Sequence, residues 1–222
     1  MIIPAHKIIF IHNPKVAGES IIQALGMPPD NIRRKTTPKR WKARVREFNK
    51  SGCHLYWHEN LKYHKDYMRG RMNYNDYYKF MFVRHPVDRF ISTFKWYKKG
   101  GLDKLDREIS AYIPETVNDL ARSIKDIQKK FSQSRHPHFH PQMYMASGLI
   151  DDLDFIGKFE TLEDDWSYIR NHLNIYDKTY DLEKTHERPV TEFSKREIDV
   201  NNESLNIIRD AYSEDFDKLG YE

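Results

Sequence analysis

Cysteine and long hydrophobic runs are what this sequence has least of. Its 222 residues include one cysteine, Cys53, so a disulfide within the chain and a metal site built on several thiolates are excluded. No apolar run approaches the length of about 18 residues that a membrane-spanning helix needs. Residues 1–12 lack the basic start and the cleavage site of a secretory signal, and they are predicted to be the first strand instead. We therefore expect a cytoplasmic protein with no membrane span.

Internal repeats and low-complexity segments are also missing. A hydrophobic fraction of 39% and an aromatic fraction of 14% are sufficient for one packed core, so residues 1–222 are predicted to form a single domain. The net charge is +4, and residues 31–46 carry many basic side chains and no acidic one. Such a block either lies solvated at the surface or attracts a polyanion.

The apolar segments that are present predict an α/β fold. Short β-branched or aromatic runs at 7–12, 79–84 and 154–159 are typical of strands, and the intervals between them leave room for crossover helices. This spacing predicts a mostly parallel sheet flanked by helices. Helices are predicted over residues 19–25, from Pro86 to about Gly100, and from about Asn202.

The segment IHNPKVAGESI, residues 11–21, follows the first predicted strand and precedes a predicted helix. Free N–H groups at a helix start favour an anion, and Lys15 adds a positive charge. The nucleoside-triphosphatase pattern GxxxxGK[ST] is not matched, because Lys15 comes three residues before Gly18. The segment therefore predicts a different phosphate or sulfate site.

Pro14, Lys15, Gly18 and Ser20 resemble the phosphosulfate loop of sulfotransferases that use 3′-phosphoadenosine 5′-phosphosulfate (PAPS), especially the carbohydrate sulfotransferase branch. KFMFVRHPVDRFISTF, residues 79–94, resembles the family's segment that binds the 3′-phosphate. The resemblance implies a P-loop-like sulfotransferase fold and PAPS as cofactor, without a metal. The residues it places at the nucleotide are Lys15, Val16, Ala17, Gly18, Glu19, Ser20, Arg84, Ser92 and, in the segment KTHERPV, Arg188.

Glu19 departs from the family pattern, which has a threonine or serine at this position. An ionised carboxylate cannot donate a hydrogen bond to phosphate. We expect the side chain to point away, capping Ser20 or pairing with a basic residue such as Arg84 or one of residues 33–46. Only the backbone N–H of Glu19 is then left for the ligand.

Three further segments, 136–145, 154–166 and 211–221, are similar to the same family. The resemblance thus spans nearly the whole chain and is weakest between residues 27 and 75. It implies an in-line transfer of the sulfuryl group to an acceptor hydroxyl, with Lys15 stabilising the departing phosphate. The acceptor is expected to be a glycan or another hydroxyl compound.

The general base implied by the resemblance is a histidine or glutamate between the two nucleotide motifs. His54, His58 and Glu59 lie there. His54 resembles the family's histidine at the end of a short strand and is the first candidate catalytic residue, with His58 as its rival. His138, Gln142 and Glu59 are the predicted acceptor contacts, and His138 is a second candidate for the base.

Three other interpretations are kept at this point. The alternating histidines at 136, 138 and 140 are compatible with a metal site, although the neighbouring prolines favour an acceptor loop. A nucleotide kinase would share the sheet and the phosphate loop, but its lysine position is missing. A nucleic-acid-binding module would use residues 33–46 with Trp41, yet it leaves both phosphate motifs without a role.

Overall fold

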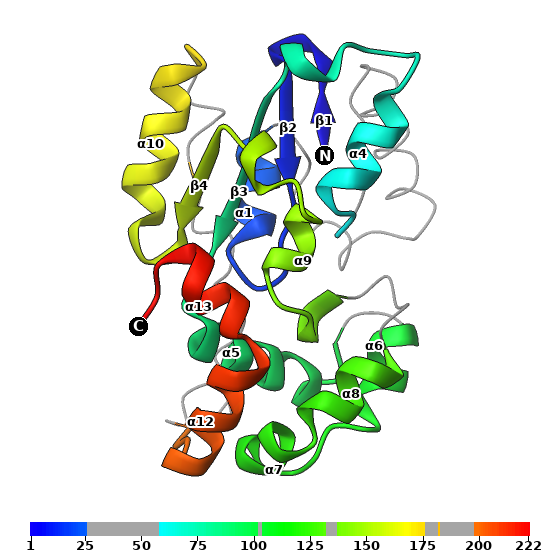
Figure 1. Cartoon of the computed structure of the whole chain (residues 1–222), viewed down its shortest axis with the longest axis vertical. Coiled ribbons are helices and arrows are strands. Elements are labelled where there is room, and N and C mark those ends of the chain that lie inside the picture. The colour runs from blue at the N-terminus through cyan, green and yellow to red at the C-terminus, as the bar shows by residue number, and fades with distance from the viewer. Residues whose placement is uncertain (26–57, 102–103, 132–136, 176–181, 183–197) are drawn as a thin grey trace. The chain divides into compact units, whose positions relative to one another are not determined.

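The computed structural model describes residues 1–25, 58–101, 104–131, 137–175, 182 and 198–222 (Figure 1). The chain divides into two compact units. The first, here called the sheet unit, comprises Met1–Val83 and Met145–Glu187, and the second, the helical unit, comprises Arg84–Tyr144 and Arg188–Glu222. The expectation of a single domain stays a prediction.

The sheet unit contains a four-stranded sheet in the order β1-β2-β3-β4. Its strands are β1 (Ile2–Ile3), β2 (Ile8–Ile11), β3 (Tyr78–Val83) and β4 (Phe155–Lys158). β2, β3 and β4 run parallel, with Phe10 opposite Phe80 and Met81 opposite Ile156, whereas β1 pairs with β2 antiparallel. The predicted α/β class with a mostly parallel sheet is confirmed.

One strand prediction needs correction. Residues 1–12 do not form a single strand, because the 3₁₀ helix Pro4–His6 separates β1 from β2. Pro4 has no N–H for a sheet ladder, and its fixed φ suits the first turn of a helix. Lys7 then takes a left-handed conformation with φ 51°, which reverses the chain into β2.

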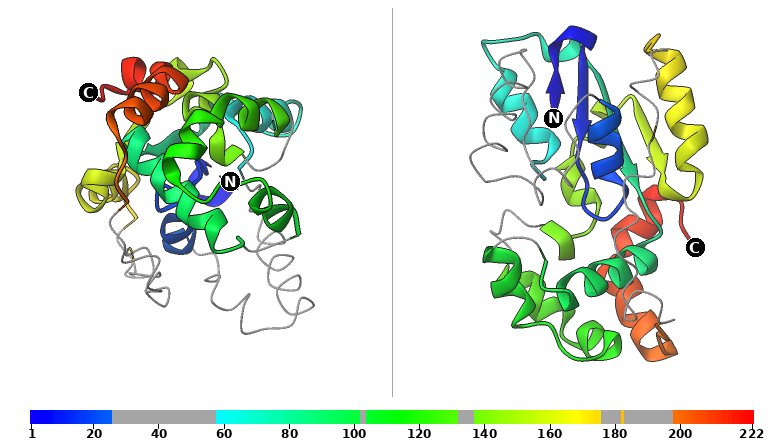
Figure 2. Two further views of the ribbon diagram at one scale, coloured as in Figure 1. Left: turned by 90° about the horizontal axis from the view of Figure 1, so that it is seen from below. Right: turned by 180° about the vertical axis from the view of Figure 1, so that it is seen from behind.

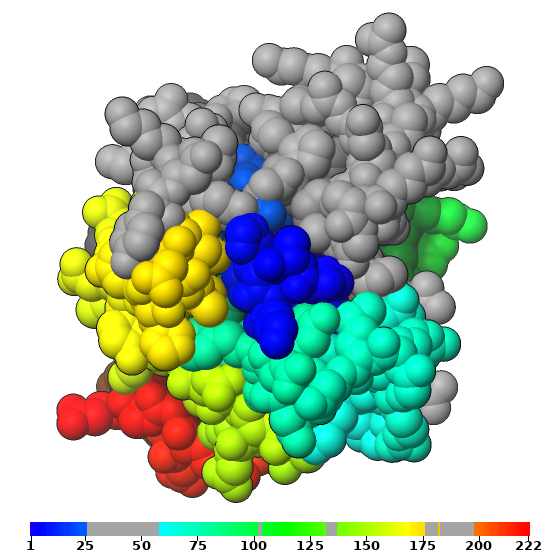
Figure 3. All heavy atoms as spheres, turned by 90° about the horizontal axis from the view of Figure 1, so that it is seen from above, coloured from blue at the N-terminus to red at the C-terminus, as the bar shows by residue number. Residues whose placement is uncertain are grey.

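Two helices cover one face of the sheet. The buried side chains of β2 and β3 on this face pack against α1 (Gly18–Ala24) and α10 (Leu162–His172). In the right-hand view of Figure 2, α1 lies in front of the strands and α10, in yellow, stands to their right. Gly157 in β4 packs against Phe82, where a Cβ would lie 2.5 Å from the ring. The sheet unit also contains α4 (Leu61–Met68). In Figure 3 the N-terminal segment, in blue, lies between the yellow residues of α10 and the cyan residues that include α4.

The helical unit is built around α5 (Pro86–Lys98), whose predicted limits are confirmed. Phe90, Phe94 and Tyr97 of α5 are buried in an apolar cluster with side chains from the neighbouring helices. Those helices are α6 (Lys104–Ser110), α7 (Val117–Arg122), α8 (Ile124–Lys130), α12 (Asn202–Ala211) and α13 (Ser213–Leu219). The C-terminal helix predicted from Asn202 is therefore present as α12.

Short helical segments complete the described chain. They are α9 (Met143–Ala146) and the 3₁₀ helices Tyr74–Asp76, Pro137–Phe139, Ile150–Asp152 and Phe159–Thr161. Within the described ranges, every helix is too short or too polar to cross a membrane.

Candidate functional site

The anion loop, residues 12–20, connects β2 to the first turn of α1. Two of its residues have left-handed backbone, Lys15 with φ 68° and Ala17 with φ 62°. Such a conformation costs free energy in residues other than glycine and is typically kept at functional sites. Left-handed turns of this kind also direct backbone N–H groups into one concavity, which is an anion-binding geometry. The sequence prediction of an anion loop therefore agrees with its backbone shape.

The start of α1 has no side-chain cap. Ala17 is the N-cap residue, and its methyl group cannot accept a hydrogen bond from the helix. The first N–H groups of a helix have no partner within the helix, and they form the positive end of its dipole. Lys15, partly buried, adds a full positive charge two residues earlier. This donor set suits a phosphate or sulfate group.

Gly18 is required by the packing of the loop against His12. A Cβ on Gly18 would lie 2.1 Å from Cδ2 and 2.2 Å from Nε2 of His12. His12 is only 4% exposed, so its ring cannot move into solvent to make room. His12 was not predicted from the sequence, where nothing marks it except its place before the loop.

The other predicted loop residues lie as follows. Val16 is fully buried in the core of the sheet unit, so only its backbone can serve a ligand. Glu19 and Ser20 lie in the first turn of α1 and are partly buried. The Oε2 atom of Glu19 is shielded from solvent. The predicted orientation of Glu19 away from the ligand stays a prediction.

His58 contacts the beginning of the anion loop. Its Nδ1 atom lies 3.0 Å from the backbone oxygen of His12, and the two imidazole rings are 4.4 Å apart between centroids. A carbonyl oxygen only accepts, so Nδ1 of His58 carries the proton in this bond. In the neutral ring the lone pair is then on Nε2, which is the basic nitrogen. His58 has φ 53°, another left-handed backbone held at this site.

His12 is held in its neutral form. Burial lowers the pKa of His12 well below the ordinary value of 6.5, and the neighbouring His58 lowers it further. A neutral ring beside His58 adds no second positive charge there. The loop thus carries a cationic lysine and one imidazole, and the imidazole of His58 contacts its start.

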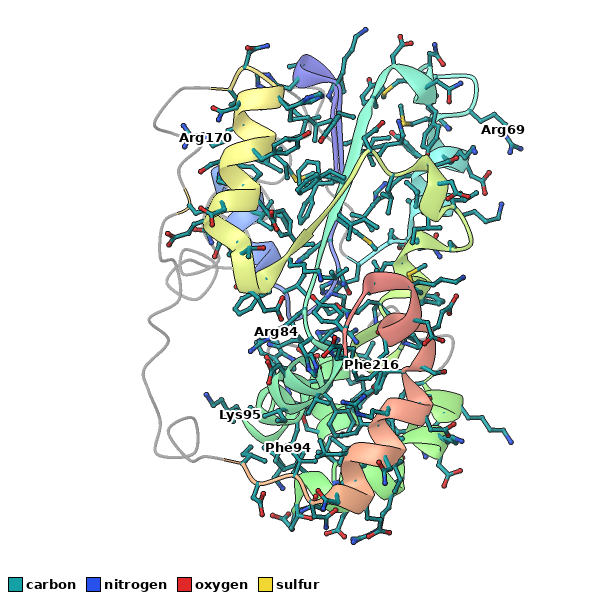
Figure 4. All side chains as sticks on the ribbon, turned by 60° about the vertical axis from the view of Figure 1, so that its left-hand side comes forward. Arg69, Arg84, Phe94, Lys95, Arg170 and Phe216 are labelled. Carbon is teal, nitrogen blue, oxygen red and sulfur yellow. The ribbon has the colours of Figure 1, made fainter. Side chains whose placement is uncertain are left out.

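A second group of predicted residues is in the helical unit and includes Arg84, which is labelled in Figure 4. Gln142 is fully buried, and its side-chain amide bonds both polar atoms of the Arg84 backbone. Arg84 N–H donates to Oε1 of Gln142 at 2.9 Å, and Nε2 of Gln142 donates to the Arg84 oxygen at 2.8 Å. Ser92, partly exposed, is on α5 two turns after Arg84. The prediction that Gln142 contacts an acceptor stays a prediction, but its amide is already engaged here.

Asp215 of α13 supports the same segment. This fully buried carboxylate accepts from the backbone N–H of Gln142 at 2.7 Å and of Met143 at 2.9 Å. Burial raises the pKa of Asp215, while the charge of Arg89 and these N–H groups act in the opposite direction. Arg89 is itself 2% exposed and donates to the backbone oxygens of His140 at 2.9 Å and Pro137 at 3.3 Å. Arg89 therefore braces this segment against α5.

His138 lies in the aromatic interior of the helical unit and is 6% exposed. Its Nδ1 atom is 3.1 Å from the hydroxyl oxygen of Tyr97, and its ring stacks on Trp96 with an interplanar angle of 12°. His140 instead stacks on Tyr144. In the described part of the chain, no three His, Cys, Asp or Glu side chains gather in a way that could hold a metal ion.

Several predicted residues lie outside the described ranges. They are His54, Arg188, His136 and the basic block 31–46. Glu59 is described and partly buried, directly before Asn60, whose side chain caps α4.

Comparison with known proteins agrees with the sequence resemblance. The chain is 24% identical over 178 residues to carbohydrate sulfotransferase 9 of Homo sapiens, covering 66% of this chain and 38% of that protein. It is 25% identical over 164 residues to carbohydrate sulfotransferase 14 of Danio rerio, covering 65% and 44% respectively. Carbohydrate sulfotransferase 12 of Xenopus laevis is 25% identical over 210 residues, covering 77% and 47%.

The chain spans less than half the length of these curated relatives. No solved structure gives a significant match. The sequence profile described as "Sulfotransferase family" matches residues 1–222, which is the whole chain. The chain belongs to the sulfotransferase family.

Proposed function

We propose that this protein transfers a sulfuryl group from PAPS to a hydroxyl group of a carbohydrate, with a histidine as general base. The observation that carries the proposal is the anion loop, where Lys15 and left-handed backbone at residues 15 and 17 precede a helix start without a side-chain cap. The whole-chain family match supports sulfotransfer, and the names of the three relatives support a carbohydrate acceptor. The cytoplasmic location expected from the sequence stays a prediction.

The residues present fit PAPS. When bound, PAPS supplies an activated sulfuryl group and a phosphate as leaving group. Lys15 and the backbone N–H groups from Val16 to Ser20 would hold the phosphosulfate, because they combine a positive charge with several donors. Arg84 and Ser92 would hold the 3′-phosphate, since a guanidinium forms paired hydrogen bonds with phosphate.

His58 is our choice for the general base. Its Nδ1–H donates to the His12 carbonyl oxygen, so Nε2 is the basic nitrogen of the neutral ring and would take the proton of the acceptor hydroxyl. Lys15 would stabilise the negative charge that the leaving phosphate gains. His54 remains the alternative base, and Glu59 the third candidate.

Ligand-dependent unfolding tests the nucleotide. The full chain is heated with 3′-phosphoadenosine 5′-phosphate (PAP), with ATP plus magnesium, and with an oligonucleotide. At a PAP concentration of about 100 times Kd, binding to the native state adds about 2.7 kcal/mol, or about 5 to 10 °C in Tm for a chain of this size. If only ATP plus magnesium raises the Tm, the result supports the kinase alternative. If only the oligonucleotide raises the Tm, the result supports the nucleic-acid alternative.

Sulfate transfer from PAPS to a panel of glycans and small hydroxyl compounds tests the reaction. Lys15→Met removes the charge and keeps a long side chain, so transfer should fall by about a thousandfold. The Tm without ligand should stay near that of the wild type. Transfer at the wild-type rate by this variant would remove Lys15 from the mechanism.

A further inference from the structure

Gln142 contacts Arg84 in a way that ordinary packing does not require. The amide of Gln142 meets both the N–H and the carbonyl oxygen of the same residue, at 2.9 and 2.8 Å. This is the two-point pairing that one strand offers another, here supplied by one side chain. Two bonds to one residue restrict its backbone dihedrals at the point where the chain enters α5 at Pro86.

Gln142 is in turn held by Asp215. The carboxylate accepts the backbone N–H groups of both Gln142 and Met143, at 2.7 and 2.9 Å. Asp215 and Gln142 are both 0% exposed, so water does not compete for these bonds. A carboxylate on α13 therefore fixes the glutamine, and the glutamine fixes the backbone of Arg84.

The two bonds from the Gln142 amide end on the main chain of Arg84, and Arg84 as a whole is partly exposed. An arginine loses considerable rotamer freedom when its guanidinium is ordered on a ligand. If the backbone of Arg84 is already fixed, less conformational entropy is lost when the ligand binds. Preorganisation raises affinity in this way.

We propose that Gln142 and Asp215 are positioning residues, which fix the main chain of Arg84 so that its guanidinium meets the 3′-phosphate of the nucleotide. The inference rests on the proposed function, because it takes Arg84 as the 3′-phosphate contact. It assigns Gln142 to the nucleotide end of the reaction instead of to the acceptor. Neither residue needs to touch the ligand.

The 3′-phosphate offers a readout that a general loss of stability would not change. PAP and adenosine 5′-monophosphate (AMP) differ only in that phosphate, so the ratio of their dissociation constants reports the contact. Gln142→Met keeps the length of the side chain and removes both bonds to Arg84. By isothermal titration we expect the PAP Kd to rise about tenfold and the AMP Kd to stay within about twofold.

Gln128 provides a matched control in the same unit. Its Nε2 donates to the backbone oxygen of Phe139 at 2.8 Å, a bond of equal length that does not involve Arg84. Gln128→Met should leave the ratio of the two dissociation constants unchanged. An equal loss of the ratio in both glutamine variants would overturn the inference.

A double-mutant cycle makes the test stricter. Arg84→Ala should remove the preference for PAP over AMP by itself. In that background Gln142→Met should have no further effect on the PAP Kd, because a positioning residue acts only through the group it positions. Additive effects of the two substitutions would contradict the proposal.

Asp215→Asn covers the case in which Gln142→Met does not fold. The asparagine keeps one acceptor for the two N–H groups, and a smaller loss of the same ratio is expected. A wild-type chain that binds PAP no better than AMP, or an Arg84→Ala variant with an unchanged ratio, would overturn the proposed function and this inference together. A ratio that depends on Arg84 but not on Gln142 or Asp215 would overturn this inference alone.

Discussion

In the sheet unit the predicted anion contacts depend on the backbone of one short loop, whereas in the helical unit they depend on side chains from distant parts of the sequence. The anion loop is shaped by left-handed residues at 15 and 17 and by a glycine against a buried ring. Arg84 is held by Gln142, 58 residues away, which is held by Asp215, a further 73 residues away. The loop can be recognised in the sequence as a contiguous motif. The bonds among Arg84, Gln142 and Asp215 can be recognised only in the folded structure.

The largest expected effect is in the helical unit. Arg89→Met removes the buried guanidinium that bonds two backbone oxygens and opposes the effect of burial on Asp215. Removing one partner of a buried charged interaction lowers the free energy of unfolding by about 3 to 5 kcal/mol. We expect that loss in the free energy of unfolding measured with urea.

Arg122→Met is the control for this experiment. Arg122 makes ion pairs with Asp119 and Glu203 at 2.9 and 3.0 Å, but at an exposed position where water competes. Its loss should be much smaller than that of Arg89→Met. Equal losses would mean that the burial of Arg89 does not increase its contribution to the free energy of unfolding.

In the sheet unit, His58 is proposed to take the proton of the acceptor hydroxyl. His58→Gln keeps a donor for the His12 oxygen but has no basic nitrogen, so kcat should fall about a hundredfold. The Kd for PAP should change by less than about twofold, since the base does not bind the nucleotide. Turnover at the wild-type rate would transfer the role of base to His54, Glu59 or His138.

Backbone shape is tested by Gly18→Ala. The new Cβ would meet the buried ring of His12 at 2.1 Å, and overpacking of this kind costs about 1 to 3 kcal/mol. PAP affinity should fall as well, because the loop must shift. The comparison variant is Gly70→Ala, at an exposed glycine with φ +72° and nothing within 4 Å, which carries a backbone penalty without a collision.

Gly70→Ala should leave PAP affinity unchanged. A clash with His12 also predicts rescue, so His12→Ala combined with Gly18→Ala should recover part of the PAP affinity. Without recovery, the requirement for glycine at position 18 would have another cause.

The smallest effect is a dependence of stability on pH. Burial lowers the pKa of both His12 and His64 well below 6.5, so the unfolded chain binds these protons more readily than the native state. Stability is therefore complete above pH 6.5 and falls as the pH drops toward the native pKa values. The slope is about 1.4 kcal/mol per pH unit for each ring.

His64→Gln should reduce the slope of unfolding free energy against pH by the contribution of one imidazole. The slope is measured by urea unfolding at several pH values below 6.5. An unchanged slope in this variant would contradict burial as the cause.

Local patterns predicted the central elements of the fold. β-branched and aromatic runs gave β2, β3 and β4, and helical spacing between Pro86 and Gly100 gave α5, because in each case neighbouring residues share one environment. The break at Pro4 was missed although proline was visible there. A run of apolar residues on both sides concealed it.

The site was predicted less completely, for a physical reason. Lys15 and Gly18 lie in a contiguous motif, whereas the contact between His58 and His12 joins residues 46 positions apart. The prediction that His138 contacts an acceptor came from the neighbouring prolines and the family resemblance, and it stays a prediction. The contacts of its ring with Trp96 and Tyr97 of α5 were not predicted. The environment of the His138 ring is set by residues that are distant in the sequence, and a single sequence does not show which residues those are.

The two hydrogen bonds between the Gln142 amide and residue 84 do not depend on which side chain residue 84 carries. They end on a main-chain N–H and a main-chain oxygen, which every amino acid except proline provides. Lysine, histidine or a neutral residue can therefore be exchanged for the arginine while its support stays in place. Under the proposed role of Arg84 as the 3′-phosphate contact, position 84 is a suitable place to redesign nucleotide preference while these backbone bonds are kept.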